Sequence, residues 1–380
     1  MLFDTQTTEN LEPIIKWAGG KEKELKYIIP NAPASFNHYY EPFVGGGSVF
    51  AAFEAKKFFI NDKSDELIGL YTCIKSKDKG FFQWVDLIIS SWSNMLRYVA
   101  HHTELQTLYK SYRQEDIDSD TVKAKLTKHL ADNKKELSSV ISQAFKWHRD
   151  TYEKELKVNL VRKVLRMYKL EKEKGIMPDR DVHDNIETAF MSALYMYYRC
   201  LYNDAGLKGS DPRLSTALFL FIRNYSYSGM FRYNDKGDFN VPYGGIAYNT
   251  KSLQKKIDYY KSDALSEHFK KTKIDNLDFE EFFRLNPPKK DDFVFLDPPY
   301  DSDFSTYAQN EFTREDQKRL ADYLCNECKG KWMMVIKYTP FIYSLYENKG
   351  LTISTFDKQY LVSFMNRNDK NAEHLIIMNY

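Results

Sequence analysis

Strand-like and helix-like segments alternate at both ends of this sequence, and a long helical stretch separates the two ends. From about residue 75 to residue 207 Gly and Pro almost vanish, and charged-apolar periodicity over 121–174 and 185–201 predicts helices. The pattern therefore predicts an α/β core that is discontinuous in sequence and carries an α-rich insertion. Its strands are expected at residues 39–44, 57–61, 272–274, 293–296, 332–336, 352–356 and 374–379.

The composition is that of a globular protein whose charges nearly balance. Of the 380 residues, 43% are hydrophobic and 16% aromatic, which is too many for a largely disordered chain. The formal net charge is only +2, so nucleic-acid binding would need positive charge gathered on one face. Residues 121–175, with 15 Lys and Arg against 7 Asp and Glu, are either such a face or a solvated helical surface. Candidate phosphate contacts within them are Arg162, Lys163 and Arg166.

The four cysteines predict neither a disulfide framework nor a metal site. Only Cys325 and Cys328 form a CxxC pair, and this pair lies in a helical pattern with no second pair nearby. We therefore expect no metal and a reducing compartment. Residues 1–10 lack a basic-then-apolar leader, and no apolar run is long enough to span a bilayer. The chain is thus expected to be soluble and cytoplasmic, without a membrane partner.

A short turn that could hold a planar amine follows the predicted strand at 293–296. It reads Asp297-Pro298-Pro299-Tyr300 and would end a buried strand. A carboxylate and a backbone carbonyl fixed by proline can both accept hydrogen bonds from one exocyclic NH2 group, while an aromatic ring can stack on a flat heterocycle. Taken alone, the four residues are equally compatible with a strand-terminating turn and a surface Tyr.

Three glycines stand between a predicted strand and the following helix. Residues 41–48 read EPFVGGGS, and bare backbone at this place can approach a ligand at the carboxyl edge of a parallel sheet. The GxGxxG spacing is absent, so a dinucleotide cradle is not expected, although a plain tight turn is an alternative. Asp62 ends the next strand, where its carboxylate can accept from both ribose hydroxyls. A nucleoside cofactor without a diphosphate, beside a site for an amine, points to S-adenosylmethionine.

Residues 225–245 change character from the helical stretch before them. Aromatic residues flank the turn sequence Asn234-Asp235-Lys236-Gly237, and the segment ends in Pro242-Tyr243-Gly244-Gly245. Asn, Asp and Gly favour the backbone conformations of tight turns between antiparallel strands. The segment therefore predicts an exposed, aromatic-rich hairpin.

With KWAGGK at residues 16–21, these motifs resemble those of the Dam-like, alpha-group (D12 class) site-specific DNA adenine-N6 methyltransferases. That family places a KWxGGK segment first, then the glycine motif, a target-recognition region and DPPY, and this sequence follows the same order. The resemblance implies a Rossmann-like S-adenosylmethionine-dependent methyltransferase sheet with a largely α-helical target-recognition domain carrying the β-hairpin. We expect the catalytic domain at residues 1–75 and 250–380 and the recognition domain at 76–249, including an insertion at 76–207 that exceeds the family's shorter members.

The resemblance also implies roles for individual residues. Asp62 is similar to the acid that binds the cofactor ribose, Phe43 and Gly45 to residues that line its methionine part, and Phe279 to the residue beside its adenine. The complete set of cofactor contacts implied is Trp17, Lys21, Phe43, Gly45, Asp62, Phe279 and Asp297. The catalytic residues implied are Asp297, Pro298 and Tyr300, which would hold an adenine flipped out of the duplex, and the DNA contacts of the hairpin are Arg232, Tyr233, Asn234 and Pro242.

The implied activity is transfer of a methyl group from S-adenosylmethionine to the exocyclic N6 of adenine in double-stranded DNA. An N4-cytosine methyltransferase is the nearest alternative, because its target is also an exocyclic amine, and a non-catalytic DNA-binding protein with the same fold is another. Methylation at C5 of cytosine is not expected, because no Cys follows a Pro. A bacterial or phage-encoded, nucleoid-associated enzyme is implied, and a cognate restriction endonuclease enters consideration as its partner in restriction-modification.

Overall fold

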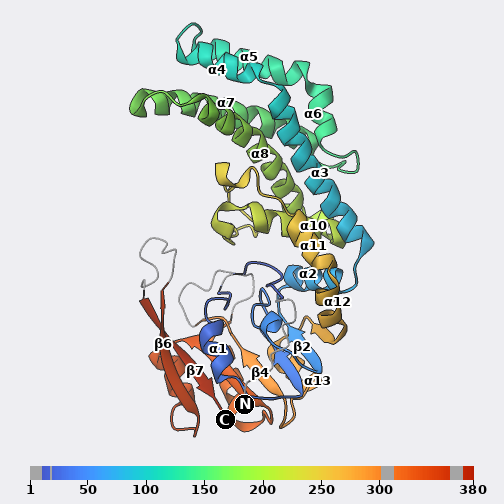
Figure 1. The fold of residues 1–380 in the computed structure, drawn as a ribbon, viewed down its shortest axis with the longest axis vertical. Helices are drawn as coiled ribbons and strands as arrows, with labels where there is room; N and C mark the ends of the chain where they lie inside the picture. The colour runs from blue at the N-terminus through green and yellow to red at the C-terminus, as the bar shows by residue number, and fades with distance from the viewer. Residues whose placement is uncertain (1–10, 18, 301–311, 360–370) are drawn as a thin grey trace, which may run out of the picture. The chain divides into compact units, whose positions relative to one another are not determined.

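The computed structural model describes residues 11–17, 19–300, 312–359 and 371–380 (Figure 1). The chain divides into two compact units. The first unit joins Met1–Ser76 to Tyr259–Tyr380, and the second is Lys77–Asp258. Both ends of the sequence thus contribute to one unit, as an α/β core interrupted by an insertion requires.

The first unit contains a seven-stranded sheet with strand order β3-β2-β1-β4-β5-β7-β6. The five strands from β3 to β5 are parallel, whereas β7 runs antiparallel to both β5 and β6. The first strand is shorter than expected and ends at Glu41, since Pro42 has no N–H to continue the ladder. The strands are β1 (His38–Glu41), β2 (Lys57–Asn61), β3 (Thr272–Asp275), β4 (Phe293–Leu296), β5 (Lys331–Lys337), β6 (Thr352–Gln359) and β7 (Asn371–Met378).

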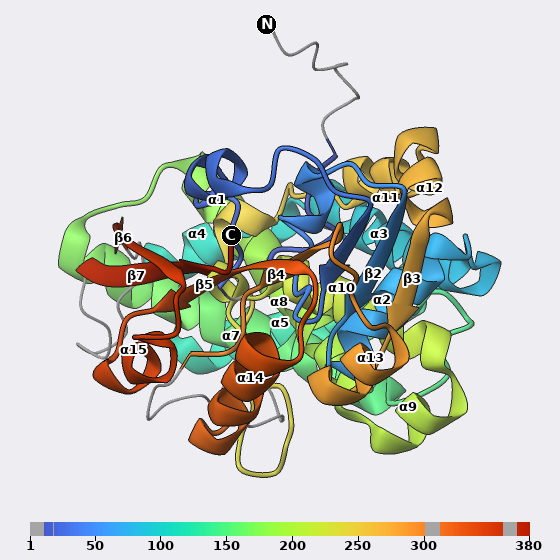
Figure 2. The same cartoon turned by 90° about the horizontal axis from the view of Figure 1, so that it is seen from below.

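Helices cover both faces of this sheet. Figure 2 shows α13, α14 and α15 along one face and α1 and α12 along the opposite face. All four residues of β4 are buried, as expected for a parallel strand covered on both sides. The α13, α14 and α15 face is packed with apolar side chains, among them Phe282, Leu320 and Trp332. The helices of this unit are α1 (Leu25–Asn31), α2 (Asp65–Lys75), α12 (Asp263–Lys270), α13 (Phe279–Leu285), α14 (Arg314–Asn326) and α15 (Pro340–Tyr346).

The direction of strand addition reverses between β1 and β4. From β1 the sheet continues to β2 and β3 on one side, while β4 and β5 continue it on the other. The register aligns Tyr39 with Phe293 and Tyr40 with Val294. In parallel α/β sheets, ligands bind at such a reversal, beyond the carboxyl ends of the strands. Residues 42–48, called the glycine loop, follow β1, and residues 297–300, called the Asp297 turn, follow β4. The fold therefore brings both segments to this edge of the sheet.

The second unit is helical. α7 and α8 pack against each other as a hairpin joined by four residues, Gly175 to Pro178, and α3 contacts both α8 and α10. The segment 121–174 forms parts of three helices, because the chain leaves helical geometry at Asn133 and again before His148, where φ is +52°. The helices are α3 (Lys79–His101), α4 (Glu104–Arg113), α5 (Ser119–Asp132), α6 (Lys134–Val140), α7 (Arg149–Lys174), α8 (Asp179–Asn203), α9 (Ala205–Ser210) and α10 (Pro212–Tyr225), and α11 (Gln254–Lys261) lies across the boundary of the units.

The expected hairpin at 225–245 is present as two separated antiparallel bridges. Ser226 pairs with Tyr243, and Tyr233 pairs with Phe239. The turn is closed by the Asn234 N–H, which donates to the Asp238 carbonyl over 2.8 Å. Within the described part of the chain, no helix combines the length and apolarity needed to cross a membrane.

Candidate active site

Lys21 connects the N-terminal segment to the turn after β4. Its side chain is only 2% exposed, and its ammonium forms an ion pair with the carboxylate of Asp297. The same ammonium donates to the Gly19 carbonyl over 2.9 Å and to the Tyr300 hydroxyl over 3.1 Å. A buried ammonium is tolerated when each of its hydrogens has an acceptor, and these three partners meet that need. The structure thus brings Lys21, Asp297 and Tyr300 together.

A second acid, more deeply buried than Asp297, belongs to the same charge cluster. Glu41, the last residue of β1, is 2% exposed and accepts a 2.7 Å hydrogen bond from the Tyr39 hydroxyl. Burial raises the pKa of the Glu41 carboxyl well above its usual range, and the charge of Asp297 acts in the same direction. The Tyr39 hydrogen bond and the charge of Lys21 oppose this rise. Sequence analysis did not assign Glu41 a role, although an acid at the end of a buried strand was a usable signal.

The glycine loop is pressed against the N-terminal segment. A side chain at Gly46 would begin 2.2 Å from the Ile15 carbonyl oxygen, a distance that no Cβ tolerates. Gly47 has a φ of +79°, and its Cβ would meet the Tyr71 hydroxyl at 2.4 Å. At Gly45 the nearest atom to an added Cβ belongs to the ring of Trp17, 3.0 Å away. The loop therefore needs bare backbone, and Trp17 lies directly beside it.

Asp62 lies next to the same loop, immediately after β2. Its Oδ2 accepts from the Gly45 N–H and its Oδ1 from the Ser64 N–H, each over 3.0 Å. Burial raises the pKa of the Asp62 carboxyl, and the N–H groups of Ser64, Gly45 and Lys63 act against that rise. Each carboxylate oxygen has a further lone pair, so Asp62 can accept additional hydrogen bonds from a ligand.

Asn61 holds together the loops that follow three neighbouring strands. Its side chain is 1% exposed, and its Nδ2 donates to the carbonyls of Pro42 and Leu277, each over 3.0 Å. Its Oδ1 accepts from the Leu277 N–H over 2.8 Å. One amide thus positions the turn before the glycines and the segment before Phe279. Asn61 was not predicted, because an Asn at a strand end does not reveal which loops lie across from it.

Aromatic rings line the loops after β1 and β3. The Phe43 ring lies 6.0 Å from Phe279 and 5.5 Å from Phe312, measured between ring centroids. Phe279 starts α13 and is 3% exposed, whereas Phe43 is only half-buried. The guanidinium of Arg319 stands 4.8 Å from the centroid of the Phe279 ring. Phe43 therefore offers the more accessible of the two predicted rings.

The turn after β4 is held from outside by α14. Gln317 is fully buried, and its Nε2 donates to the Pro299 carbonyl over 2.7 Å. The side chain of Asp297 is 19% exposed, while Pro298 is buried. The Tyr300 ring meets the His374 ring edge-on at 5.6 Å between centroids. Gln317 was not predicted, and nothing in its sequence surroundings signals this contact.

The predicted DNA contacts are in the second unit. Arg232 is exposed, and its Nε donates to the Asn240 side chain across the hairpin over 2.8 Å. Asn234 instead serves the turn itself, since its Oδ1 accepts from the N–H groups of Lys236 and Asp238. The Tyr233 hydroxyl lies 3.2 Å from that of Tyr202. Pro242 is exposed, and its carbonyl accepts from Tyr227 over 2.9 Å.

The sequence profile of D12 class N6 adenine-specific DNA methyltransferases matches residues 17–362. The chain belongs to this family. It is 26% identical to the type II methyltransferase M.CviBI of Paramecium bursaria Chlorella virus NC1A, over 97% of this chain and 100% of that protein. It is 26% identical to the type II methyltransferase M1.LlaDCHI of Lactococcus lactis subsp. cremoris, over 86% and 81%. With the DNA adenine methylase of Escherichia coli strain K12 it shares 32% identity over 34% of this chain and 44% of that protein.

Family membership settles the activity at the level of the reaction. The chain is an enzyme that methylates adenine in DNA at specific sites, which decides against the N4-cytosine and non-catalytic alternatives. Its mostly parallel seven-stranded sheet with flanking helices agrees with the methyltransferase fold that the sequence predicts. The family generally uses S-adenosylmethionine as the methyl donor and DNA as the substrate.

Replacing Asn61 by Ala is expected to destabilise the first unit by about 1 to 3 kcal/mol, because the buried carbonyl of Pro42 and the partly buried carbonyl of Leu277 would lose their donor. Urea unfolding followed by tryptophan fluorescence measures the change. Asn276→Ala is the matched control, since that exposed amide makes one hydrogen bond, to the Asp62 carbonyl, that water can replace. Equal unfolding curves for the two variants would show that Asn61 does not hold these loops.

Proposed function

We propose that the edge of the sheet at β1 and β4 is where this enzyme holds S-adenosylmethionine and the target adenine, and that the hairpin of the second unit reads the DNA. The observation that carries the proposal is the ion pair between Lys21 and Asp297, which joins the N-terminal motif to the turn after β4. It unites two segments that are distant in sequence at the reversal of strand order, where α/β proteins bind ligands.

The residues beside the glycine loop fit a nucleoside cofactor with a methionine tail. Asp62 can accept further hydrogen bonds from the two ribose hydroxyls, and the bare backbone of Gly45, Gly46 and Gly47 lets a ligand approach closely. Phe43 supplies an accessible ring beside the proposed methionine part of the cofactor. Phe279 is proposed to lie beside the adenine of the cofactor. Trp17, Lys21 and Asp297 complete the proposed contacts. When bound, S-adenosylmethionine supplies an electrophilic methyl group.

Asp297 and the Pro298 carbonyl are proposed to accept the two hydrogens of the adenine N6 amine. The nitrogen lone pair is delocalised into the ring, so the amine becomes nucleophilic only as it turns pyramidal. Acceptors aimed at its hydrogens favour that geometry and stabilise the positive charge that develops on nitrogen. Lys21 already neutralises Asp297 in this structure, so the amine must share that carboxylate with the ammonium or displace it.

Tyr300 is proposed to stack on the adenine once it has left the duplex. A base inside the stack is out of reach of a turn at a sheet edge, so the enzyme must flip it out. The hydroxyl of Tyr300 accepts from Lys21, which restrains the ring at the site before DNA binds. Such restraint lowers the entropy cost of forming the stacked complex.

The second unit is proposed to bind the DNA through the hairpin residues Arg232, Tyr233, Asn234 and Pro242 and through a basic face of α7. In that face Arg162 and Arg166 are exposed. Burial lowers the pKa of Lys163, and the neighbouring charges of Arg166 and Arg162 act in the same direction. Concentrated positive charge of this kind suits a phosphate backbone.

A cognate restriction endonuclease is proposed as a functional partner, since two relatives with long coverage are named type II methyltransferases. Methylation by this chain would then protect the sites that the endonuclease cuts. Expression in a methylation-free host, followed by long-read mapping of modified adenines, would define those sites.

Asp297→Ala is expected to lower turnover on duplex DNA by about 10²- to 10³-fold, because the acceptor for the amine is lost. Transfer of a radiolabelled methyl group to DNA measures it. Asp291→Ala removes an exposed acid from the loop before β4 and is the matched control, expected to keep full activity. Activity of Asp297→Ala at the level of this control would remove the carboxylate from the mechanism.

Tyr300→Ala is expected to weaken productive DNA binding by about 1 to 3 kcal/mol, the worth of one stacked base. Cofactor affinity measured by calorimetry should stay nearly constant, while the fluorescence of 2-aminopurine at the target position should report less flipping. Tyr343→Ala, on an exposed tyrosine of α15, provides the control. Unaltered turnover and flipping in Tyr300→Ala would contradict the stacking role.

Arg232→Ala is expected to cost about 1 to 3 kcal/mol of binding to the recognised site and to relax preference at one base position. Arg232→Lys keeps the charge but loses the planar fork that reads a base edge, so it should show most of the same loss. Competition binding against a set of singly substituted sites measures both variants. A uniform loss over all sequences, rescued by Lys, would reduce Arg232 to a backbone contact.

A further inference from the structure

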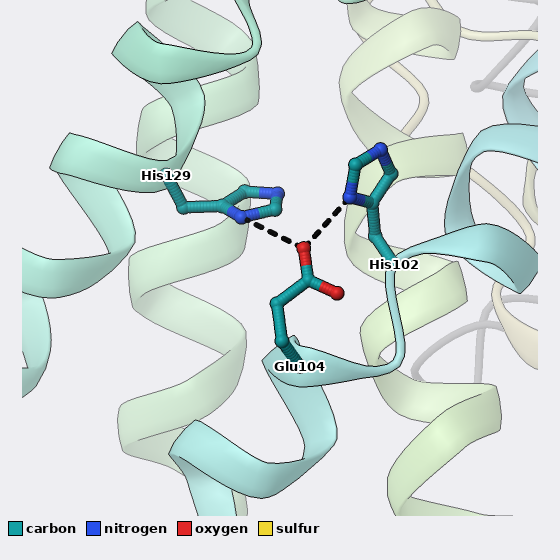
Figure 3. A group of neighbouring side chains, drawn as sticks. All are labelled: His102, Glu104 and His129. Carbon is teal, nitrogen blue, oxygen red and sulfur yellow. Dashed lines mark hydrogen bonds and ion pairs between the residues drawn. The ribbon is translucent and has the colours of Figure 1, made fainter.

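Two histidines and a glutamate gather where α3, α4 and α5 meet. His102 caps the end of α3, Glu104 begins α4, and His129 lies in the last turn of α5. The Glu104 Oε1 lies 2.7 Å from His102 Nδ1 and 3.4 Å from His129 Nδ1, and Figure 3 shows the carboxylate between the two rings. One ligand atom from each of the three residues falls within 4.8 Å of the others. No role for these residues follows from the methyltransferase reaction.

The far nitrogen of each ring has its own partner. His102 Nε2 faces a carboxylate oxygen of Glu136 at 3.2 Å, and His129 Nε2 faces the hydroxyl of Tyr98 at 2.9 Å. Histidines that bind metals almost always hold their second ring nitrogen against a carboxylate, carbonyl or similar group, which fixes the tautomer and the orientation of the ring. Both rings therefore have the outer contacts that orient a metal ligand.

The proton positions around Glu104 favour a cation between the rings. Asn133 Nδ2 donates to the His129 carbonyl over 2.9 Å and lies 3.4 Å from His129 Nδ1. An amide nitrogen can only donate, so His129 Nδ1 accepts from Asn133 and has no proton for the Glu104 carboxylate, which lies 3.4 Å from it. His102 faces carboxylates with both nitrogens, although a neutral imidazole has a single N–H. A metal ion at the two Nδ1 atoms resolves both conflicts.

We propose that His102, Glu104 and His129 bind one divalent transition metal ion, with Zn²⁺ as the favoured ion. Zinc is bound by imidazole nitrogen and carboxylate oxygen at about 2.0 to 2.2 Å in a tetrahedron, which sets ligand atoms roughly 3.4 Å apart. The 3.4 Å between Glu104 and His129 matches this spacing, whereas the 2.7 Å between Glu104 and His102 would have to lengthen when the ion binds. The Glu104 side chain is 56% exposed, which leaves the fourth position to water. Imidazole ligands disfavour Mg²⁺ and Ca²⁺.

The bound ion would act as a clamp within the second unit. It would tie the α3–α4 junction to the end of α5, and through Glu136 it would engage α6. Metal binding to a site that exists only in the folded chain adds to the stability of that fold. The proposed ion would therefore stabilise the helical insertion and would take no part in methyl transfer.

The test uses the untagged full-length chain, freed of metal by a chelator and then titrated with Zn²⁺ in a calorimeter. The wild type is expected to bind one Zn²⁺, and an excess of Mg²⁺ should not displace it. The midpoint of thermal unfolding should rise when Zn²⁺ is added. Co²⁺ loaded in place of Zn²⁺ should give the visible absorption of a four-coordinate ion with nitrogen and oxygen ligands. Glu136→Gln and Tyr98→Phe should weaken binding by about 10- to 100-fold, as outer contacts of a metal site do.

Glu104→Gln and His129→Asn should abolish this binding, the Co²⁺ absorption and the stabilisation by Zn²⁺. His183→Asn is the matched control, because His183 contacts Glu187 at 3.8 Å in the same unit without belonging to the three-residue cluster. Glu104 is exposed, so its replacement is expected to leave the fold of the metal-free chain intact, which circular dichroism checks. Wild type without stoichiometric Zn²⁺ binding would overturn the proposal. Equal binding by His129→Asn and His183→Asn would overturn it as well.

Discussion

The parallel pairing of β1 with β4 is the constraint on which the site depends. Residues 38–41 and 293–296 are separated by most of the chain, yet their backbone hydrogen bonds place the ends of both strands at one edge. The sheet extends in opposite directions from this pair, and ligands bind at such a reversal in parallel α/β sheets. The glycine loop and the Asp297 turn therefore leave the sheet at the same edge.

The charges at this edge are balanced within a small group. Lys21 is buried and forms its ion pair with Asp297, and its charge also favours the ionised form of Glu41, which is 2% exposed. Removing one member of such a group leaves an uncompensated buried charge, which costs more than the pair itself contributes. The N-terminal segment is for this reason part of the site, although it precedes the first strand of the sheet.

Most of the α/β unit and its motifs were predictable, because they depend on local patterns. Strands at 57–61 and 293–296 follow from buried apolar runs, and the DPPY motif ends its strand as expected, whereas the strand before the glycines ends three residues early, at Glu41. Asn61 and Gln317 were not predictable, since each acts on a backbone group of another segment, 216 positions away for Asn61 and 18 for Gln317. The cluster of His102, Glu104 and His129 was also not predicted. The expectation of no metal rested on cysteine spacing alone, which says nothing about histidines brought together by helix packing.

The sequence by itself determined the fold class, the family and the reaction, because motif order and strand periodicity are properties of the chain. The tertiary structure alone decided which side chains touch. It paired Lys21 with Asp297, which is 276 positions away, and brought His129 to Glu104. It also made the Asn234 side chain a hydrogen-bond acceptor within its own turn. Such contacts depend on how strands pair and helices pack, which is a property of the whole folded unit and not of any short segment.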